Sequence, residues 1–354
     1  MPSRDLVVIG GSAGAIVPLR TIVAGLAGFP GTVLVVIHVP PSVKSLLPDL
    51  LTRTGALPAR HAVDGEPLAP GTILIAPPDR HLVVEDGCVR LTRDPRENGF
   101  RPAADALFRS AARAQGARVV GVVLSGALDD GTMGLAAIKA KGGLAVVQRP
   151  DDAHFPGMPR SAVDNVRVDA VRPASEIAPL LRAWAGGDPA PVIASPVSTA
   201  AESRRASGHA SGHAGSDEEQ LAQHDGLKGR TATALSCPGC QGVLLRAVDL
   251  ALLHFQCQTG HAYSPAALDH EQNDRVDRTL GAAENALRER AVLMHMMASA
   301  EDARHDAGSA TRLKLRAREL EAQAQRLREL IETELTQTHE QEPRAGEPEG
   351  RGSG

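Results

Sequence analysis

The chain has 354 residues, 42% hydrophobic and only 2% aromatic, so Ala, Val and Leu must fill most of any core. The 38 Lys and Arg against 42 Asp and Glu leave a formal charge of −4, which gives no electrostatic footprint for nucleic acid or an anionic membrane surface. No apolar run reaches the roughly 18 residues that span a bilayer, no signal-peptide pattern opens the chain, and four cysteines do not suggest a disulfide scaffold. We therefore expect a soluble cytoplasmic protein without membrane insertion.

Residues 1–185 alternate short apolar runs with helical stretches, and we expect them to form one domain. The runs are continuous, as is typical of parallel strands covered on both faces. This pattern predicts an α/β fold with a doubly wound, mostly parallel sheet. Turn pairs between residues 59 and 92, around the apolar run 72–75, predict an antiparallel insertion of hairpins. The expected strands lie at 6–9, 33–37, 119–124 and 144–147, and the expected helices at about 14–25, 43–53, 103–115 and 131–141.

A segment without periodicity follows. Residues 186–231 are rich in Ser, Ala, Gly and His and cannot bury enough apolar surface to fold, which predicts a disordered linker. Its histidines, His209 and His213, are candidates for weak metal binding only. The tail 339–354 is expected to be disordered as well.

Residues 271–338 are charged and rich in Ala and Leu at helical spacing, with Gly308–Ser309 as a natural turn between two stretches. This pattern predicts a helical hairpin or short coiled coil, through which the chain would contact a partner or a second copy. The expected apolar stripes are Val276, Leu280, Ala283, Leu287, Met294 and Met297, and then Leu313, Ala317, Leu320, Ala324, Leu327 and Ile331.

The first expected strand ends in GGSAG, around Ser12. Such a sequence is compatible with a phosphate-binding turn or with a G-x-S-x-G nucleophile turn. A dinucleotide site needs the spacing G-x-G-x-x-G and an acid after the second strand. The glycines do not fit that spacing, and His38 stands where the acid belongs, so the nucleotide interpretation is disfavoured.

Ser12, His38 and the pair Asp129–Asp130 each follow an expected strand. Helix capping explains the acidic pair alone, since acids are favoured at helix N-termini. Together the three residue types lie at carboxyl ends of strands in one sheet, where they can converge. The order Ser…His…Asp differs from the Ser…Asp…His order of α/β hydrolases.

At this point the sequence resembles the catalytic domain of chemotaxis protein-glutamate methylesterases, the CheB-type enzymes. The matching segments run in order through nearly all of residues 1–185: VVIGGSAGAI, VVIHVPP, ILIAPPDRHL, FRPAADALFRSAA, VVLSGALDDGTMGL and FPGMPRSAV. The familiar enzyme carries a phosphorylatable receiver domain before the catalytic domain. This chain begins at the catalytic strand, so phosphorylation control within the chain is not expected.

The resemblance implies a Ser-His-Asp triad that needs no cofactor. Ser12 would be the nucleophile, His38 the general base and Asp130 the acid that orients it. The implied substrates are glutamate methyl esters on chemoreceptor helices, with glutamine deamidation as a second activity. The backbone N–H near Ala13 is the expected oxyanion donor. Family members often carry Thr at the place of Ala13 and Met-Gly at 127–128, where this chain has Ala-Leu.

Further residues of the matched motifs carry weaker expectations. Arg101, followed by Pro102 and with Arg109 nearby, is a candidate contact for an acidic substrate helix, although a helix start and a solvated face explain it equally well. Met158 and His81 are candidates to line the cleft or to pack in the core. Cys88 is expected to be a small core residue.

Residues 232–270 contain the set Cys237, Cys240, Cys257 and His261, with C-x2-C and C-x3-H spacing. Four such ligands suit tetrahedral Zn²⁺ and leave no open position, so the pattern predicts a structural zinc module. Two hypotheses for the whole chain follow: a serine carboxyl-ester hydrolase acting on methylated receptors, or a non-catalytic signalling scaffold that binds a receptor or partner helix.

Overall fold

The computed structural model describes residues 4–41, 45–187 and 230–341. These residues belong to two compact units, 1–269 and 270–354, which we describe separately. The expected linker histidines, His209 and His213, lie outside the described residues, as does most of the expected tail.

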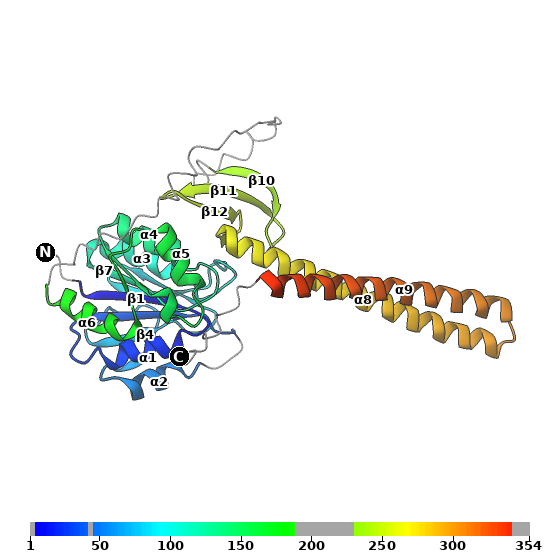
Figure 1. Cartoon of the computed structure of the whole chain (residues 1–354), viewed down its shortest axis with the longest axis horizontal. Helices are drawn as coiled ribbons and strands as arrows, with labels where there is room; N and C mark the ends of the chain where they lie inside the picture. The colour runs from blue at the N-terminus through cyan, green and yellow to red at the C-terminus, as the bar shows by residue number, and fades with distance from the viewer. Residues whose placement is uncertain (1–3, 42–44, 188–229, 342–354) are drawn as a thin grey trace, which may run out of the picture. The chain divides into compact units, whose positions relative to one another are not determined.

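The first unit is built on a parallel seven-stranded sheet in the order β3-β4-β2-β1-β7-β8-β9 (Figure 1). Every neighbouring pair is parallel. The doubly wound α/β fold is therefore confirmed. The strands are β1 (Leu6–Gly11), β2 (Thr32–Ile37), β3 (Ala59–His61), β4 (Thr72–Ile75), β7 (Val119–Val123), β8 (Leu144–Gln148) and β9 (Ala170–Arg172).

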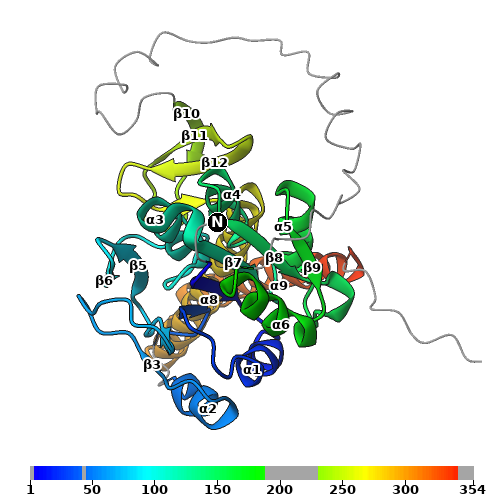
Figure 2. The same cartoon turned by 90° about the vertical axis from the view of Figure 1, so that its left-hand side faces the viewer.

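Helices cover both faces of this sheet, as Figure 2 shows. Alternate residues of each strand enter different cores: Val7 and Ile9 pack with α1, α2 and α6, whereas Leu6 and Val8 pack with α3, α4 and α5. Burial on both faces is the reason that the strand sequences read as continuous apolar runs. The helices are α1 (Ile16–Ala24), α2 (Leu47–Thr54), α3 (Ala104–Gln115), α4 (Thr132–Ala140), α5 (Gly157–Asn165) and α6 (Ala174–Ala185), with short 3₁₀ turns at Gly116–Arg118 and Pro150–Asp152.

The antiparallel insertion is smaller than predicted. Only β5 (His81–Glu85) and β6 (Cys88–Thr92) form an antiparallel hairpin. The run 72–75 is instead strand β4 of the main sheet, parallel to β2. Its sequence, Thr-Ile-Leu-Ile, is the continuous apolar type that parallel strands require, and three of its four residues are buried.

The Cys/His module, residues 230–269, is the C-terminal part of the first unit. Its antiparallel sheet contains β10 (Thr231–Ser236), β11 (Val243–Asp249), β12 (Leu252–Cys257) and β13 (Ala262–Tyr263). Its small core combines Cys237, Cys257 and Tyr263 with Leu244 and Leu268, the last from the first turn of α8 (Pro265–Ala303). β13 also forms a parallel bridge between Ala262 and Glu97.

The second unit contains most of α8 and the helix α9 (Ala307–Gln341), which confirms the expected helical hairpin. The turn lies at 304–306 rather than at Gly308–Ser309, because His305 takes a positive φ of 63° and Asp306 caps α9 by accepting from the Ser309 N–H at 2.9 Å.

The apolar stripe of α9 is confirmed, with Ala317, Leu320 and Ala324 buried. The stripe of α8 is confirmed in part. Leu280, Leu287 and Met294 are half-buried as expected. Val276, Ala283 and Met297 are exposed instead, and the remaining buried positions are Glu284, Ala291 and Ala298. Glu284 tolerates this seam position because Arg288 and Arg328 pair with its carboxylate at 2.6 and 3.0 Å.

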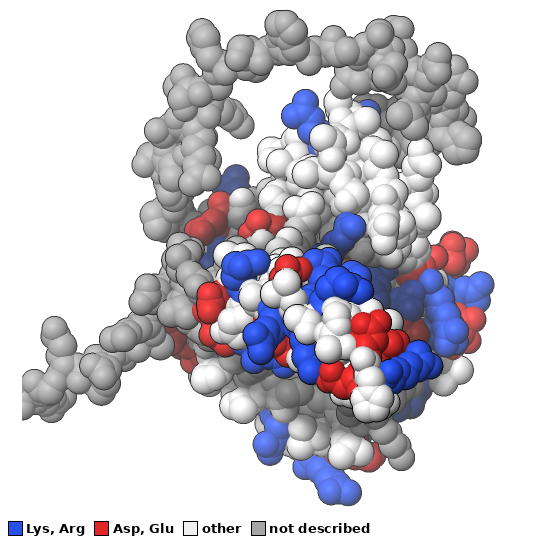
Figure 3. All heavy atoms as spheres, turned by 90° about the vertical axis from the view of Figure 1, so that its right-hand side faces the viewer, with Lys and Arg blue, Asp and Glu red and all other residues white. Residues whose placement is uncertain are grey.

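Surface charges of both signs are mixed on the face drawn in Figure 3. In the hairpin, neighbouring opposite charges pair, as in Lys314–Asp302 at 2.6 Å and Arg316–Glu319 at 2.7 Å. Such exposed pairs add little stability, but they prevent a large positive or negative electrostatic potential on the surface of the hairpin. Among the residues that the structure describes, no helix combines the length and apolar character that a membrane span needs.

Candidate active site

Three strands of the sheet end at one edge with polar side chains. Ser12 follows β1, His38 follows the neighbouring strand β2, and Asp130 lies in the loop after β7 on the other side of β1. The chain leaves β1 toward β2 and returns at β7, so the strand order reverses here. Such a reversal opens a crevice beyond the carboxyl ends of the strands, where doubly wound folds place their ligands.

The three side chains form one hydrogen-bonded series. The His38 Nδ1 lies 3.1 Å from the Ser12 Oγ, and the His38 Nε2 lies 2.7 Å from the Asp130 Oδ2. Because the Asp130 carboxylate accepts from Nε2–H, Nδ1 carries no proton and is able to accept one from the hydroxyl. In chymotrypsin-type proteases Nε2 faces the serine and Nδ1 the aspartate, so the imidazole here is used in the opposite sense.

Asp130 is 2% exposed and surrounded by donors. Its carboxylate accepts from the Ala104 N–H at 2.6 Å and the Asp105 N–H at 3.2 Å, at the N-terminus of α3. Burial raises the pKa of the Asp130 carboxyl, but the hydrogen bonds from His38, Ala104 and Asn98 outweigh it, so this pKa lies below its usual value.

A second buried carboxyl, Asp105, lies beside it. Burial and the neighbouring charge of Asp130 raise the pKa of Asp105 well above its usual value. Two adjacent carboxylates do not both ionise readily, so the opposite directions place the negative charge on Asp130. That is the carboxylate in contact with His38.

The turn that carries Ser12 is held by Ser125, a fully buried residue two positions after the end of β7. The Ser12 N–H donates to the Ser125 carbonyl at 2.9 Å, and the Ser125 Oγ donates to the Ala13 carbonyl at 2.8 Å. Gly14 takes a φ of +74°, and a Cβ there would lie 2.7 Å from the Ser125 Oγ. Gly14 is thus required both because of its positive φ and because a side chain there would collide with Ser125.

Comparison with known proteins identifies this architecture. The family model for CheB methylesterase matches residues 7–181. Residues 7–181 are therefore a CheB-type methylesterase domain. A protein-glutamate methylesterase/protein-glutamine glutaminase of Anaeromyxobacter dehalogenans is 40% identical over 179 residues, which cover 50% of this chain and 52% of that relative. One from Caulobacter vibrioides is 36% identical over 183 residues, or 50% and 53% of the two chains.

A solved structure is similar as well. The crystal structure of the Thermotoga maritima CheB methylesterase catalytic domain is 34% identical, with a TM-score of 0.49, and the match covers 50% of this chain and 97% of that one. The chain spans about half the length of the curated relatives that it matches.

Gly126 lies between Ser12 and Met158 of the CheB methylesterase domain. A Cβ at Gly126 would lie 2.1 Å from the Met158 Sδ and 2.9 Å from the Ser12 Cβ. We expect Gly126→Ala to destabilise the protein by about 1–3 kcal/mol, because Met158 is fully buried and has little room to move. Thermal melts would measure this. Gly281→Ala, at a site open within 4 Å, is the control, and equal melting of both variants would contradict the close packing.

The other predicted site residues have varied surroundings. Ala13 is exposed, and the structure records no acceptor for its N–H among the residues it describes. The Arg101 guanidinium donates to the Asp79 carboxylate at 2.7 and 3.0 Å and to two loop carbonyls, which is the environment of a structural side chain. Met158 and His81 are fully buried. A substrate role for Ala13, Arg101 or Met158 stays a prediction.

Sequence reasoning missed two residues that contact the series Ser12–His38–Asp130. The Phe100 ring stacks on the His38 imidazole, with centroids 3.7 Å apart and planes at 12°. The Asn98 Nδ2 donates to the Asp130 Oδ1 at 3.0 Å. Both belong to a tight turn at the sequence Asn98-Gly99, a strong hairpin-turn signal that would have located the turn.

Leu128 has an unfavourable backbone conformation, with a φ of +59°. A left-handed conformation costs a side-chain-bearing residue about 1–2 kcal/mol relative to the right-handed one. The loop before Asp130 keeps its position in spite of this, because the Gly126 N–H donates to the Phe155 carbonyl and the Met158 N–H to the Gly126 carbonyl.

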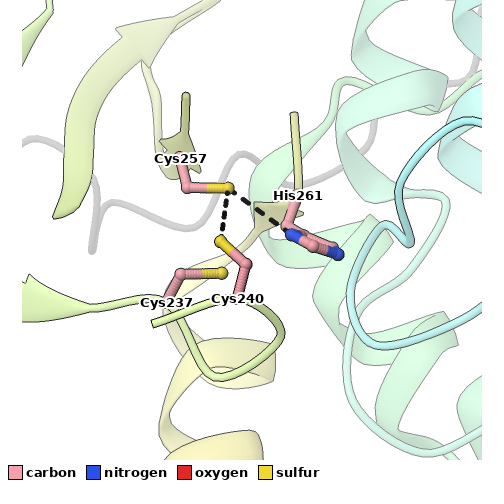
Figure 4. A group of neighbouring side chains, drawn as sticks. All are labelled: Cys237, Cys240, Cys257 and His261. Carbon is pink, nitrogen blue, oxygen red and sulfur yellow. Dashed lines mark hydrogen bonds between the residues drawn. The ribbon is translucent and has the colours of Figure 1, made fainter. Parts of the chain in front are cut away.

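The four predicted zinc ligands come together in the Cys/His module (Figure 4). Their ligand atoms lie within 4.8 Å of one another. The Cys240 Sγ is 3.6 Å from the Cys257 Sγ, and the Cys257 Sγ is 3.5 Å from the His261 Nδ1. Two thiolates on a tetrahedral Zn²⁺ lie about 3.7 Å apart, since each Zn–S bond is about 2.3 Å. The spacing therefore fits one metal ion.

The chemistry of these side chains also suits a metal. A hydrogen bond from Thr259 is the largest influence on the Cys240 thiol and lowers its pKa to about 6, whereas burial raises the pKa of Cys237 to about 11. A bound Zn²⁺ would hold each thiol as a thiolate. The His261 ring lies 3.0 Å from a Cβ placed on Gly239, so the glycine of the first turn admits the imidazole.

Proposed function

We propose that this protein is a serine carboxyl-ester hydrolase that removes methyl groups from glutamate γ-esters. The observation that carries the proposal is the series Ser12–His38–Asp130 at the carboxyl edge of the sheet, with contacts of 3.1 and 2.7 Å. The names of the curated relatives support the same substrate class. A non-catalytic scaffold has no chemical need for this arrangement, so the geometry favours the enzyme.

In the proposed reaction, the Ser12 Oγ attacks the γ-carbonyl carbon while the His38 Nδ1 takes the hydroxyl proton. The positive charge that develops on the imidazole is stabilised by Asp130, whose low pKa keeps it ionised. The tetrahedral intermediate collapses as His38 returns the proton to the departing methanol. Water then repeats the sequence on the acyl-enzyme and releases free glutamate and Ser12.

The carbonyl oxygen gains negative charge in both steps and needs donors. We assign this role to the N–H of Ala13, an exposed residue directly after the nucleophile. The Ser12 N–H is already bonded to the Ser125 carbonyl, so it is not available to the oxyanion. A glutamine γ-amide is attacked by the same route with ammonia as the leaving group, so we include deamidation in the proposal.

The proposed protein substrate is a helix of a methylated chemoreceptor, and a cytoplasmic location accompanies it as a prediction. The zinc module is proposed to be structural, because its four protein ligands would leave no open coordination position for a reaction. Self-association through the C-terminal helices stays a prediction as well.

The test is release of volatile methanol from methyl-labelled chemoreceptor membranes. We expect wild-type protein to release methanol and Ser12→Ala to fall to the background rate, because the nucleophile is gone. Ser161→Ala, which loses one hydroxyl contact with Thr132, is the control and should keep nearly full activity. Equal release by wild type and Ser12→Ala would contradict the proposal.

A further inference from the structure

The segment Glu97–Phe100 is a tight turn that contacts two members of the triad. Glu97 and Phe100 exchange both backbone hydrogen bonds, at 3.1 and 2.8 Å. Asn98 and Gly99 take positive φ values of 51° and 80°, the pattern of a two-residue type I′ turn. The turn thereby places the Phe100 ring against His38 and the Asn98 amide against Asp130 at the same time.

The side chain of Asn98 has no spare hydrogen-bonding group. Its Nδ2 donates to the Asp130 Oδ1 and to the Asp105 Oδ2, both at 3.0 Å. Its Oδ1 accepts from the Ser264 N–H at 2.9 Å, and the residue is 5% exposed. If the amide were reversed, its oxygen would face the Asp130 carboxylate. The N–H of Ser264 therefore helps to select the orientation in which Asn98 donates to the triad.

Ser264 belongs to the Cys/His module, three residues after the ligand His261. Its Oγ donates to the Asp129 carboxylate at 2.6 Å and accepts from the Ala267 N–H at 3.0 Å, so it caps α8 while holding the residue next to Asp130. The module contacts the turn on a second side, where the Ala262 carbonyl accepts from the Asn98 N–H at 2.8 Å.

The turn is also anchored from the CheB methylesterase domain. Arg109 in α3 donates to both carboxylate oxygens of Glu97 at 2.6 Å. With Arg109 on one side and Ala262 and Ser264 on the other, the turn is fixed between the two parts of the first unit. A turn that is anchored on both sides is rigid enough to hold a catalytic group in one position.

We propose that Asn98 is a positioning residue for Asp130, and that the Cys/His module supports the esterase by bracing Asn98 through Ser264. The inference rests on the proposed esterase function. It assigns to the module a direct part in the activity of the domain, and it requires no contact between the module and the substrate.

The first test is Asn98→Asp, assayed in the full chain with p-nitrophenyl acetate. Asp keeps the size, the acceptor for Ser264 and a tolerance for positive φ, but it turns an oxygen toward Asp130 and Asp105. We expect kcat to fall about 10- to 100-fold, the value of a hydrogen bond to a charged group, with KM nearly unchanged. Asn165→Asp, the same substitution at an exposed site, is the control and should match wild type.

The second test separates the module from the turn. Ser264→Ala keeps the backbone N–H that donates to Asn98 but loses the hydroxyl that holds this N–H in place through Asp129 and the start of α8. It should lower kcat about three- to tenfold, and Ser264→Thr, which restores the hydroxyl, should recover it. Thr233→Ala removes a hydroxyl bonded only within the module and should leave kcat unchanged. Asn98→Gly, which removes the amide without straining the turn, repeats the first test if Asn98→Asp does not fold.

The outcomes distinguish the two proposals. Absence of Ser12-dependent hydrolysis by wild type would overturn the esterase and this inference with it. Hydrolysis by wild type together with unchanged kcat in Asn98→Asp and Asn98→Gly would overturn the positioning role alone. Loss of activity in the Asn98 variants but full activity in Ser264→Ala would overturn the part assigned to the module.

Discussion

Asp130→Asn should lower kcat for ester hydrolysis by about 10⁴-fold, the size of the corresponding loss in serine proteases. The Asp130 carboxylate is the acceptor for the His38 Nε2–H at 2.7 Å. An amide NH₂ at that place favours the tautomer with hydrogen on Nδ1, which then points a donor at Ser12. In that tautomer His38 is unable to take the serine proton.

Asp129→Asn is the matched control for this result, because it changes the same charge one residue away. The Asp129 carboxylate accepts from the Ser264 hydroxyl, and an asparagine oxygen retains that bond. Burial raises the pKa of the Asp129 carboxyl, and this carboxyl bonds to Ser264, whereas His38 bonds to Asp130. We expect less than tenfold loss. Comparable losses in the two variants, measured as kcat at neutral pH, would contradict the assignment of Asp130.

Cys237→Ser should abolish metal binding and unfold the Cys/His module. Cys237 is fully buried and belongs to both the ligand set and the small core of the module. Structural Zn²⁺ contributes on the order of 10 kcal/mol to folding in small modules of this kind, far more than this core supplies. Elemental analysis should find about one zinc per wild-type chain and almost none in the variant.

Cys88→Ser is the control, since Cys88 lies in strand β6 outside the ligand set. It should keep its zinc, and limited proteolysis should cleave residues 230–269 in Cys237→Ser but not in Cys88→Ser. If Asn98 is braced by the module, Cys237→Ser should also lower kcat. Equal zinc in wild type and Cys237→Ser would reject the site.

The proximity of Ser12, His38 and Asp130 was predictable because each residue has its own local signal. Ser12, His38 and Asp130 each follow an apolar run, and parallel topology brings the carboxyl ends of such runs to one edge. The cluster of Cys237, Cys240, Cys257 and His261 was predictable from spacing within a short segment. In both cases the geometry follows from local sequence and a simple topological rule.

Asn98 had no such signal of function. Its partners, Asp130 and Ser264, lie 32 and 166 residues away in sequence, so only the folded chain shows that they meet. The error at Ala283 in the predicted stripe of α8 has a similar cause. A hydrophobic pattern does not predict that the neighbouring Glu284 is buried in the seam, where it pairs with Arg328. The positions of both Asn98 and Glu284 depend on polar groups that are far apart in sequence and pair only in the folded chain.

The wrong prediction for strand β4 has a different cause. Its run of four apolar or β-branched residues had the texture of the other parallel strands, but its neighbours in sequence suggested hairpins. The continuous apolar sequence of this run was therefore enough to predict a strand of the main sheet. The prediction was wrong because it gave more weight to the neighbouring turn pairs.

The most direct test of the account is covalent labelling of Ser12 with a fluorophosphonate, followed by peptide mass mapping. The reagent needs a serine activated by its base and no receptor substrate, so it examines the triad alone. We predict a single adduct on Ser12 in wild type, with labelling slowed strongly in His38→Ala and Asp130→Asn. An unlabelled Ser12, or labelling at the same rate without His38, would contradict the assignment of this site as a serine esterase.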